Sequence, residues 1–209
     1  VKVTVITADL SIPGSANEVF KQTELADLQV DYLINNAGVG GHGRFSKRDL
    51  AQERGMMQLN MTSLVELTHL YLPAMLKRRM GKILQVSSSA ALMPGPLQAT
   101  YFASKSFVLS HSQALSSELE GTGVSCTSLC PGAIETEFAQ SAGMQDTQLA
   151  SKTGASAVSV ARVGYEAMLR GDLVTINDPI IRFVLTWVFP LLPRKLVLKI
   201  ARSSMEKAR

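Results

Sequence analysis

The chain has 209 residues, of which 46% are hydrophobic, and this size and composition fit one globular domain with a substantial core. The formal net charge is +4, and no arginine-rich run is interleaved with aromatic residues, which argues against nucleic acid as a partner. No apolar run reaches the roughly 20 residues that a membrane-spanning helix requires.

Strand-like and helix-like patterns alternate along the chain at the spacing of a strand–helix repeat. A capping box formed by Ser15 and Glu18 opens the first predicted helix. In chain order, strands are predicted at residues 1–7, 31–35, 83–87, 123–129 and 173–176, and helices at 15–28, 46–80, 100–120 and 155–170, with a mobile loop at 137–154. This alternation predicts an α/β fold of the Rossmann-like type: a doubly wound parallel sheet in three α/β/α layers.

A glycine-rich loop follows the second predicted strand and contains the pattern G-x-G-x-x-G at Gly38, Gly40 and Gly43. In a dinucleotide-binding fingerprint, this pattern opens a helix at once, and an acidic residue follows the next strand. Here the next helix begins only near Ser46, and no strand that ends in an acid follows. We therefore interpret the loop as a wall of a cofactor cleft in preference to the pyrophosphate loop.

The most informative stretch runs from Gly81 to Lys105 and joins a buried strand, a serine-rich loop with prolines, and the start of a helix. Tyr101 and Lys105 are four residues apart, so on a helix they lie on one face. Ser88 stands thirteen residues before Tyr101, at the end of the strand, and the loop can fold it over that face. A hydroxyl, a phenol and an ammonium group would then meet, which suits the movement of a proton on and off a carbonyl or alcohol oxygen.

The chemistry of this trio depends on a shift of the phenol's pKa, because a free phenol with a pKa of about 10 is a poor acid or base at neutral pH. We expect the Lys105 ammonium to lower the pKa of Tyr101, and the Ser88 hydroxyl to stabilise charge on the substrate oxygen. An isolated Tyr-x-x-x-Lys pair is more often an ordinary surface feature of a helix. The serine-rich strand end before Tyr101 favours the catalytic interpretation.

Polar or turn-forming residues stand at the carboxyl ends of four predicted strands: Asp9, Asn36, Ser88, and the pair Pro131 and Gly132. The carboxyl ends of parallel strands meet at one edge of the sheet, and α/β proteins bind their ligands there. The sequence therefore predicts one ligand site at this edge.

Two cysteines, Cys126 and Cys130, lie in one predicted strand and are too far apart for a comfortable disulfide. We interpret them as core thiols in a reducing compartment, and we expect a cytoplasmic protein. His42, His69 and His111 are scattered, so we expect no metal site, and only His42 falls in a loop near the expected substrate.

The chain resembles the short-chain dehydrogenase/reductase superfamily over residues 1–177. The matching pieces are ADLS at 8–11, NNAG at 35–38, Asn60 within QLNMTS, SSS before YFASK, and PGAIETEF at 131–138. NNAG alone is moderately specific, whereas the spacing of the serine, the Tyr-x-x-x-Lys and the Pro-Gly is very specific. The resemblance implies a Rossmann-like domain at residues 1–178, followed by an extension at 179–209.

The resemblance also implies a catalytic role for four residues. Tyr101 would be the acid/base, and Ser88 would hold the substrate oxygen. Lys105 would lower the pKa of Tyr101 and bind the nicotinamide ribose. Asn60 would anchor a water molecule that links Lys105 to solvent as a proton relay.

A nicotinamide cofactor is implied by the same resemblance. Asp9 and Leu10 would contact the adenine, Asn36 the adenosine ribose, and Ile134 and Thr136 the carboxamide. The full set of implied cofactor-binding residues is Asp9, Leu10, Asn36, Ala37, Gly38, Tyr101, Lys105, Pro131, Gly132, Ile134 and Thr136. We expect NADP, with NAD as the alternative.

The family's first strand, glycine-rich turn and second strand have no counterpart here, and such a unit comprises roughly 40–60 residues. The chain starts at Val1 within an apolar strand, so we interpret it as part of a longer chain. Without that unit no helix N-terminus cradles the pyrophosphate. We therefore expect weak nucleotide binding and an exposed apolar edge of the sheet.

The resemblance also implies a substrate lid and an interface between copies of the chain. Residues 137–154 would form a substrate lid. The helix at residues 60–79 and the helix that starts at Tyr101 would form the interface of a homodimer or homotetramer.

Residues 179–209 form an apolar stretch followed by a basic amphipathic one. One interpretation is a cover for the substrate pocket or a dimer contact. The other is a helix on a membrane surface, which suits an apolar or lipid-like carbonyl substrate. Its contacting residues would be Trp187, Phe189, Lys195, Lys199 and Arg202.

Taken together, these patterns predict an NAD(P)-dependent oxidoreductase that interconverts a small-molecule carbonyl and a secondary alcohol, with Tyr101 as acid/base. The main alternative is a non-catalytic binding or scaffold protein on the same fold, which could be membrane-associated. An epimerase or a dehydratase on this fold is a third hypothesis.

Overall fold

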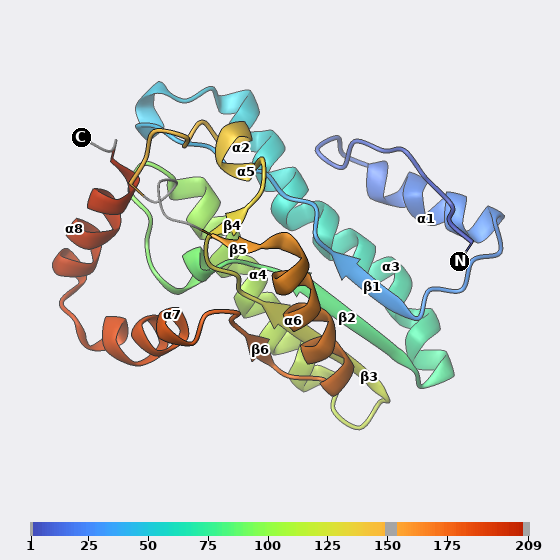
Figure 1. Cartoon of the computed structure of the whole chain (residues 1–209). Helices are drawn as coiled ribbons and strands as arrows, with labels where there is room; N and C mark the ends of the chain where they lie inside the picture. The colour runs from blue at the N-terminus through green and yellow to red at the C-terminus, as the bar shows by residue number, and fades with distance from the viewer. Residues whose placement is uncertain (1, 149–153, 207–209) are drawn as a thin grey trace.

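The computed structural model describes residues 2–148 and 154–206. Its centre is a parallel sheet with the order β1–β2–β3–β6, formed by β1 (Tyr32–Asn35), β2 (Gly81–Val86), β3 (Val124–Leu129) and β6 (Val174–Thr175). Helices α3 (Ser63–Arg78) and α4 (Ala99–Glu118) cover one face, and α6 (Ala157–Arg170) covers the other (Figure 1). The predicted Rossmann-like fold with three layers is confirmed.

The remaining elements surround this centre. They are α1 (Ser15–Leu25), η1 (Phe45–Lys47), α2 (Leu50–Met57), η2 (Gln58–Thr62), η3 (Ser89–Leu92), β4 (Ile134–Glu135), α5 (Phe138–Ser141), β5 (Ala155–Ser156), α7 (Pro179–Phe183), η4 (Val184–Val188), η5 (Phe189–Leu191) and α8 (Arg194–Met205). Strands β4 and β5 form a small parallel pair of their own. Helix α5 lies within the predicted loop at 137–154, so part of that loop is regular, and residues 149–153 lie outside the described residues.

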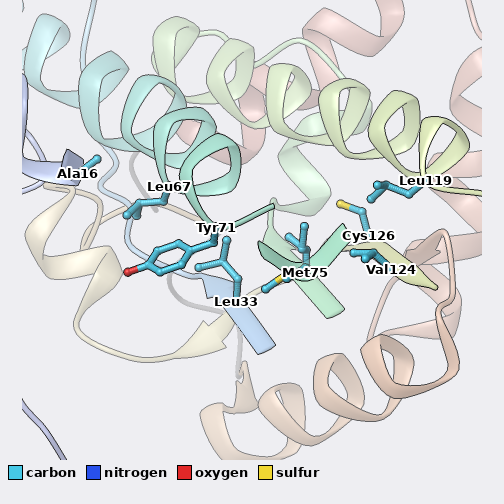
Figure 2. Close-up of a cluster of buried hydrophobic side chains, with 9 residues drawn as sticks. Ala16, Leu33, Leu67, Tyr71, Met75, Leu119, Val124 and Cys126 are labelled. Carbon is cyan, nitrogen blue, oxygen red and sulfur yellow. The ribbon is translucent and has the colours of Figure 1, made fainter. Parts of the chain in front are cut away.

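Alternation of side chains along β2 divides the core into two layers. Ile83 packs with Tyr71 and Met75 of α3, whereas its neighbour Leu84 packs with Met168 of α6. Neighbouring residues on a strand face opposite sides of the sheet, so a run of apolar residues is buried on both faces. Figure 2 shows the layer on the α3 side.

The predicted first strand is wrong. Residues 2–9 have no strand structure, and Val3 and Val5 are largely exposed. A strand needs a neighbour for its ladder of hydrogen bonds, and within the described part of the chain β1 pairs only with β2. Tyr32 and Ile34 of β1 are about half exposed, as expected for an apolar edge of the sheet.

Two predicted helix boundaries also differ. The cap of α1 is Gly14, with a φ of 89°, and Ser15 is already helical, so the capping box with Glu18 is wrong. The predicted helix at 46–80 is interrupted: its regular part starts after Asp49, whose carboxylate accepts a hydrogen bond from the Ala51 amide. It then widens into the π-helical turn η2, which contains Asn60.

The turn before β3 yields a stability prediction. Gly123 has a φ of +88°, and an added Cβ would lie 2.1 Å from the Arg79 carbonyl oxygen; Gly121 has a φ of +74° but no atom within 4 Å. Alanine at either position is strained by about 1–2 kcal/mol, and only Gly123→Ala also collides with backbone. We expect Gly123→Ala to lower the free energy of unfolding in urea by about 1–3 kcal/mol more than Gly121→Ala does. Equal losses would contradict this packing.

Candidate active site

Ser88 and Tyr101 meet at the carboxyl end of β2. Tyr101 lies in the first turn of α4, where the nearby Ser88 side chain acts to lower the pKa of its phenol. Ser88 caps η3, with its Oγ 3.1 Å from the Ala90 amide nitrogen. The Ser89 amide donates to the Pro131 carbonyl over 2.8 Å, which holds this loop against the end of β3. The loop therefore places a hydroxyl beside the phenol.

Lys105 lies one helical turn after Tyr101 and is 5% exposed. Its Nζ donates to the Val86 carbonyl over 2.9 Å and lies 6.0 Å from the centre of the Tyr101 ring. The Ser87 hydroxyl donates to the backbone carbonyl of Lys105 over 2.7 Å. The structure thus brings the hydroxyl, the phenol and the ammonium together at one edge of the sheet.

Asn60 is 1% exposed and connects the glycine-rich loop to α4. Its Oδ1 accepts from the Val39 amide at 3.0 Å, and its Nδ2 donates to the Val39 carbonyl at 2.9 Å. The same Nδ2 donates to Ser104 Oγ at 3.1 Å, next to Lys105. Asn60 is therefore a buried clamp, and the wide π-helical turn aims its side chain inward.

Gly38 packs closely against Asn60 and Lys105, and a side chain at this position would crowd both. An added Cβ would lie 3.3 Å from both Asn60 Oδ1 and Lys105 Nζ. After the loop, η1 intervenes and the next α-helix begins only at Leu50. This geometry agrees with a wall of a cleft and not with a loop that opens a helix.

Burial dominates the protonation of these groups. It raises the pKa of Tyr101 above its usual value, and the polar Ser88 side chain opposes this shift only in part. Burial also lowers the pKa of Lys105 from 10.5 to about 8. The expectation that Lys105 lowers the pKa of Tyr101 is wrong for this structure, because the ammonium binds the Val86 carbonyl and the phenol is desolvated.

The residues expected at the carboxamide lie near the end of β3. The Gly132 amide donates to Asn177 Oδ1 over 3.0 Å, and Thr136 Oγ1 accepts from the Phe138 amide at 3.3 Å. Ile134 lies in β4 and packs against the core layer below α6. Through the contact of Pro131 with the η3 loop, this segment adjoins the Ser88 side of the site.

The residues expected at the adenosine end lie at the surface or away from Tyr101. The exposed Asp9 carboxylate accepts from the Ser11 amide and hydroxyl, and these hydrogen bonds lower its pKa. The Leu10 carbonyl accepts from a side chain of α3, and Asn36 and Ala37 are exposed after β1. The structure does not bring these four residues into contact with Tyr101.

The residues near Lys105 fit the nicotinamide ribose end of a dinucleotide cofactor. The Lys105 ammonium has three donors and makes one hydrogen bond among the described residues, so two donors remain for ribose hydroxyls. The close approach of Gly38 leaves that wall free of a side chain. In residues 2–148 and 154–206, no helix begins directly after a glycine-rich turn at this edge, so we assign no pyrophosphate site there.

Apolar residues from distant segments cover Tyr101; two of them lie in the expected lid and in the C-terminal extension, but the sequence analysis singled out none of them. The Phe138 ring lies 5.4 Å from the Tyr101 ring and contacts Gly40. Met56 and Met205 join the same cluster from α2 and α8. Each is a common core residue type, so only the tertiary structure reveals the cover.

The C-terminal helix is tied to the glycine-rich loop through His42. The ring nitrogen Nε2 of His42 lies 2.7 Å from the Met205 carbonyl. Arg48 donates to the His42 carbonyl over 3.1 Å and forms a buried ion pair with Glu53. His42 thus has a structural contact and lies near the cover of the site.

The cavity beside Tyr101 is small. It measures about 30 Å³, which accommodates about one water molecule, and its walls include Phe45, Leu97 and Thr100. A larger groove of about 590 Å³ lies between the 91–96 loop, α4 and α8, on the face of α4 away from Tyr101.

The comparisons with known proteins place the chain in a family. The family model described as short chain dehydrogenase matches residues 1–147. Very-long-chain 3-oxoacyl-CoA reductase of Macaca fascicularis is 28% identical, over 99% of this chain and 65% of that protein. 17-beta-hydroxysteroid dehydrogenase type 3 of Mus musculus is 34% identical, over 68% of this chain and 48% of that protein.

A solved structure shows the same relationship. A short-chain dehydrogenase from Sphingobium yanoikuyae, in complex with NADPH, has a TM-score of 0.76 and 27% identity, over 84% of this chain and 68% of that chain. This chain spans about half the length of the curated relatives that it matches. The chain belongs to the short-chain dehydrogenase/reductase family.

Proposed function

We propose that this chain carries the proton-transfer site of an NAD(P)-dependent oxidoreductase that interconverts a carbonyl and a secondary alcohol. The observation that carries the proposal is the buried Tyr101 phenol beside Ser88, with the Lys105 ammonium 6.0 Å from the ring. Family membership supports the reaction class.

Tyr101 acts as the acid in the direction of reduction. Because burial raises its pKa, the phenol is protonated at neutral pH and can donate its proton to the carbonyl oxygen. The Ser88 hydroxyl donates to the same oxygen and stabilises the negative charge that develops on it. When bound, the nicotinamide supplies the hydride to the carbonyl carbon, or accepts it in the reverse direction.

Lys105 and Asn60 support the proton transfer. With its pKa lowered to about 8, Lys105 can exchange a proton near neutral pH, which suits a relay that reprotonates Tyr101. Asn60 positions this relay, because it joins Val39 to Ser104, the neighbour of Lys105. Two donors of the Lys105 ammonium would hold the nicotinamide ribose.

We propose NADP as the cofactor, with NAD as the alternative. The related Sphingobium dehydrogenase was solved with NADPH. The implied contacts of Asp9, Asn36 and Thr136 remain part of this proposal, as do those of the other residues of the cofactor set.

The substrate is proposed to be an apolar, lipid-like ketone. The side chains around Tyr101 are Met56, Met144, Phe138 and other apolar groups, so a polar substrate would lose hydration there without compensation. Two relatives are named for a very-long-chain 3-oxoacyl-CoA and a 17-beta-hydroxysteroid, which both contain large apolar parts.

We propose a cytoplasmic homodimer or homotetramer. Cys126 and Cys130 are buried free thiols, which suits a reducing compartment. Phe107 on α4 and Leu76 on α3 are exposed, which suits a contact between copies on these helices. The lid role of residues 137–148 is supported by the contact of Phe138 with Tyr101.

The direct test of the proposed acid is the substitution Tyr101→Phe. We expect kcat/KM for reduction of an apolar ketone with NADPH to fall about 100- to 10,000-fold, because the acid is lost. Binding of NADPH, measured by its fluorescence, should persist. Tyr165→Phe on α6 is the matched control and should keep full activity, since Tyr165 is exposed and contacts Tyr32.

Two outcomes would refute this assignment. Full turnover of Tyr101→Phe would remove Tyr101 from the chemistry. A wild-type protein that neither binds NADPH or NADH nor reduces any ketone would favour the scaffold alternative.

The lowered pKa of Lys105 predicts a dependence of stability on pH. The unfolded chain binds this proton with a pKa of 10.5 and the folded chain with a pKa of about 8, so the free energy of unfolding rises with pH between these values. We expect the Lys105→Met variant to lack this rise. The difference in the free energy of unfolding between the wild type and the variant should therefore change by about 3 kcal/mol in favour of the wild type from pH 8 to 10.5. A constant difference over this range would contradict the buried ammonium.

A further inference from the structure

An apolar stripe on the C-terminal extension faces solvent. Ile180, Phe183, Trp187 and Leu191 are 73%, 60%, 67% and 85% exposed. Their spacing of three, four and four residues places them on one side of the helical segment 179–191. Single exposed apolar residues are common, but a continuous stripe of large ones marks a surface that another body covers.

Contacts with the domain hold the segment 179–191 in place, and in this position its apolar stripe faces solvent. Asp178 caps α7 by accepting from the amides of Ile180 and Ile181 at 2.8 and 2.9 Å. Ile181 contacts Gly132, and Leu185 is buried on the inner side. Figure 1 shows α7 and α8 at the end of the molecule away from α1.

Positive charge is concentrated on the same extension. Residues 179–209 contain seven basic residues and one acidic residue, a net charge of +6, whereas the whole chain carries +4, so residues 1–178 carry −2. Among the described residues, Arg202 pairs with Glu206, and Arg182, Arg194, Lys195 and Lys199 form no ion pair. The charge is therefore available to an anionic partner.

Helix α8 presents these cations outward. Its Val197, Ala201 and Met205 are buried against the domain, at a spacing of four residues. Lys195 and Lys199 lie on the exposed side. The extension therefore combines an apolar stripe at 180–191 with exposed cations on the helix that follows it.

We propose that residues 179–206 form a docking surface for an anionic lipid bilayer. The apolar stripe, with Trp187 at its centre, would enter the boundary between head groups and acyl chains, and the cations of α8 would contact anionic head groups. Within the described residues, no helix is long and apolar enough to cross a membrane.

A second copy of the chain fits this surface less well. In a two-fold symmetric contact the same patch faces itself, so the +6 charge of one extension would oppose the +6 charge of the other. A bilayer with anionic lipids supplies apolar and negative groups together.

Trp187 is the only tryptophan of the chain, so its fluorescence reports on this surface alone. We expect its emission to shift to shorter wavelength when vesicles of phosphatidylcholine and phosphatidylserine are added. Acyl chains with nitroxide labels should quench it. Vesicles of phosphatidylcholine alone, or added salt, should give a weaker response, because the attraction of the cations is lost or screened.

Vesicle pelleting with variants separates the two components of binding. We expect Phe183→Ala with Leu191→Ala to abolish pelleting, and Lys195→Gln with Lys199→Gln to weaken it about fivefold per lysine. The matched controls are Leu25→Ala with Val158→Ala, and Lys47→Gln with Lys77→Gln, which replace exposed residues elsewhere. All these side chains are at the surface, so the variants should fold, as circular dichroism can check.

Three results would overturn the proposal. One is an unchanged Trp187 emission with anionic vesicles. The second is equal pelleting of the extension variants and their controls. The third is a shift of the emission without vesicles that depends on protein concentration and accompanies a doubled mass in sedimentation, which would assign the surface to a second copy.

Discussion

The side chain of Asn60 makes the contact on which the site depends. It pairs with both backbone groups of Val39 and with Ser104, and it thereby joins the glycine-rich loop, the π-helical turn and α4. Each of these buried groups would cost about 1–3 kcal/mol if it were left without a partner. The arrangement therefore holds Gly38 against Lys105 with little freedom.

Desolvation governs the chemistry of the site more than attraction between charges. The phenol and the ammonium are both nearly inaccessible, and burial shifts the pKa of each towards its neutral form. A protonated phenol next to a weakly held ammonium proton suits an enzyme that delivers a proton to a carbonyl oxygen. The apolar cover from α2, α5 and α8 contributes to this desolvation, and the proposed apolar substrate rests on the same cover.

The sequence predicted the parts of the fold and site that follow from local patterns. The alternation of strands and helices, and the face shared by Tyr101 and Lys105, are set by periodicity, and the structure has both. It did not predict that residues 2–9 lack strand structure, because pairing depends on a neighbouring strand and not on β-branched residues. It offered the segments of Phe138 and Met205 as a lid and a possible cover, but it did not single out these residues, because contacts between distant segments leave no local signal. The pKa direction of Tyr101 was wrong because burial is a tertiary property.

Helix α8 takes part both in the cover of the active site and in the proposed membrane surface, through opposite sides. The inner side of α8 closes the cover through Met205, and its outer side carries the cations of the proposed membrane surface. A protein that takes an apolar ketone from a bilayer would benefit from this proximity. The Phe138 ring lies 5.4 Å from the Tyr101 ring, at the cover of the phenol.

The most direct measurement of the central claim is a crystal structure of the natural protein with NADPH and an unreactive analogue of an apolar ketone. The account predicts that the analogue's oxygen lies about 2.6–3.2 Å from both Tyr101 Oη and Ser88 Oγ, with Phe138 moved away from the phenol. An analogue oxygen held by other residues, with Tyr101 still covered by Phe138, would contradict it.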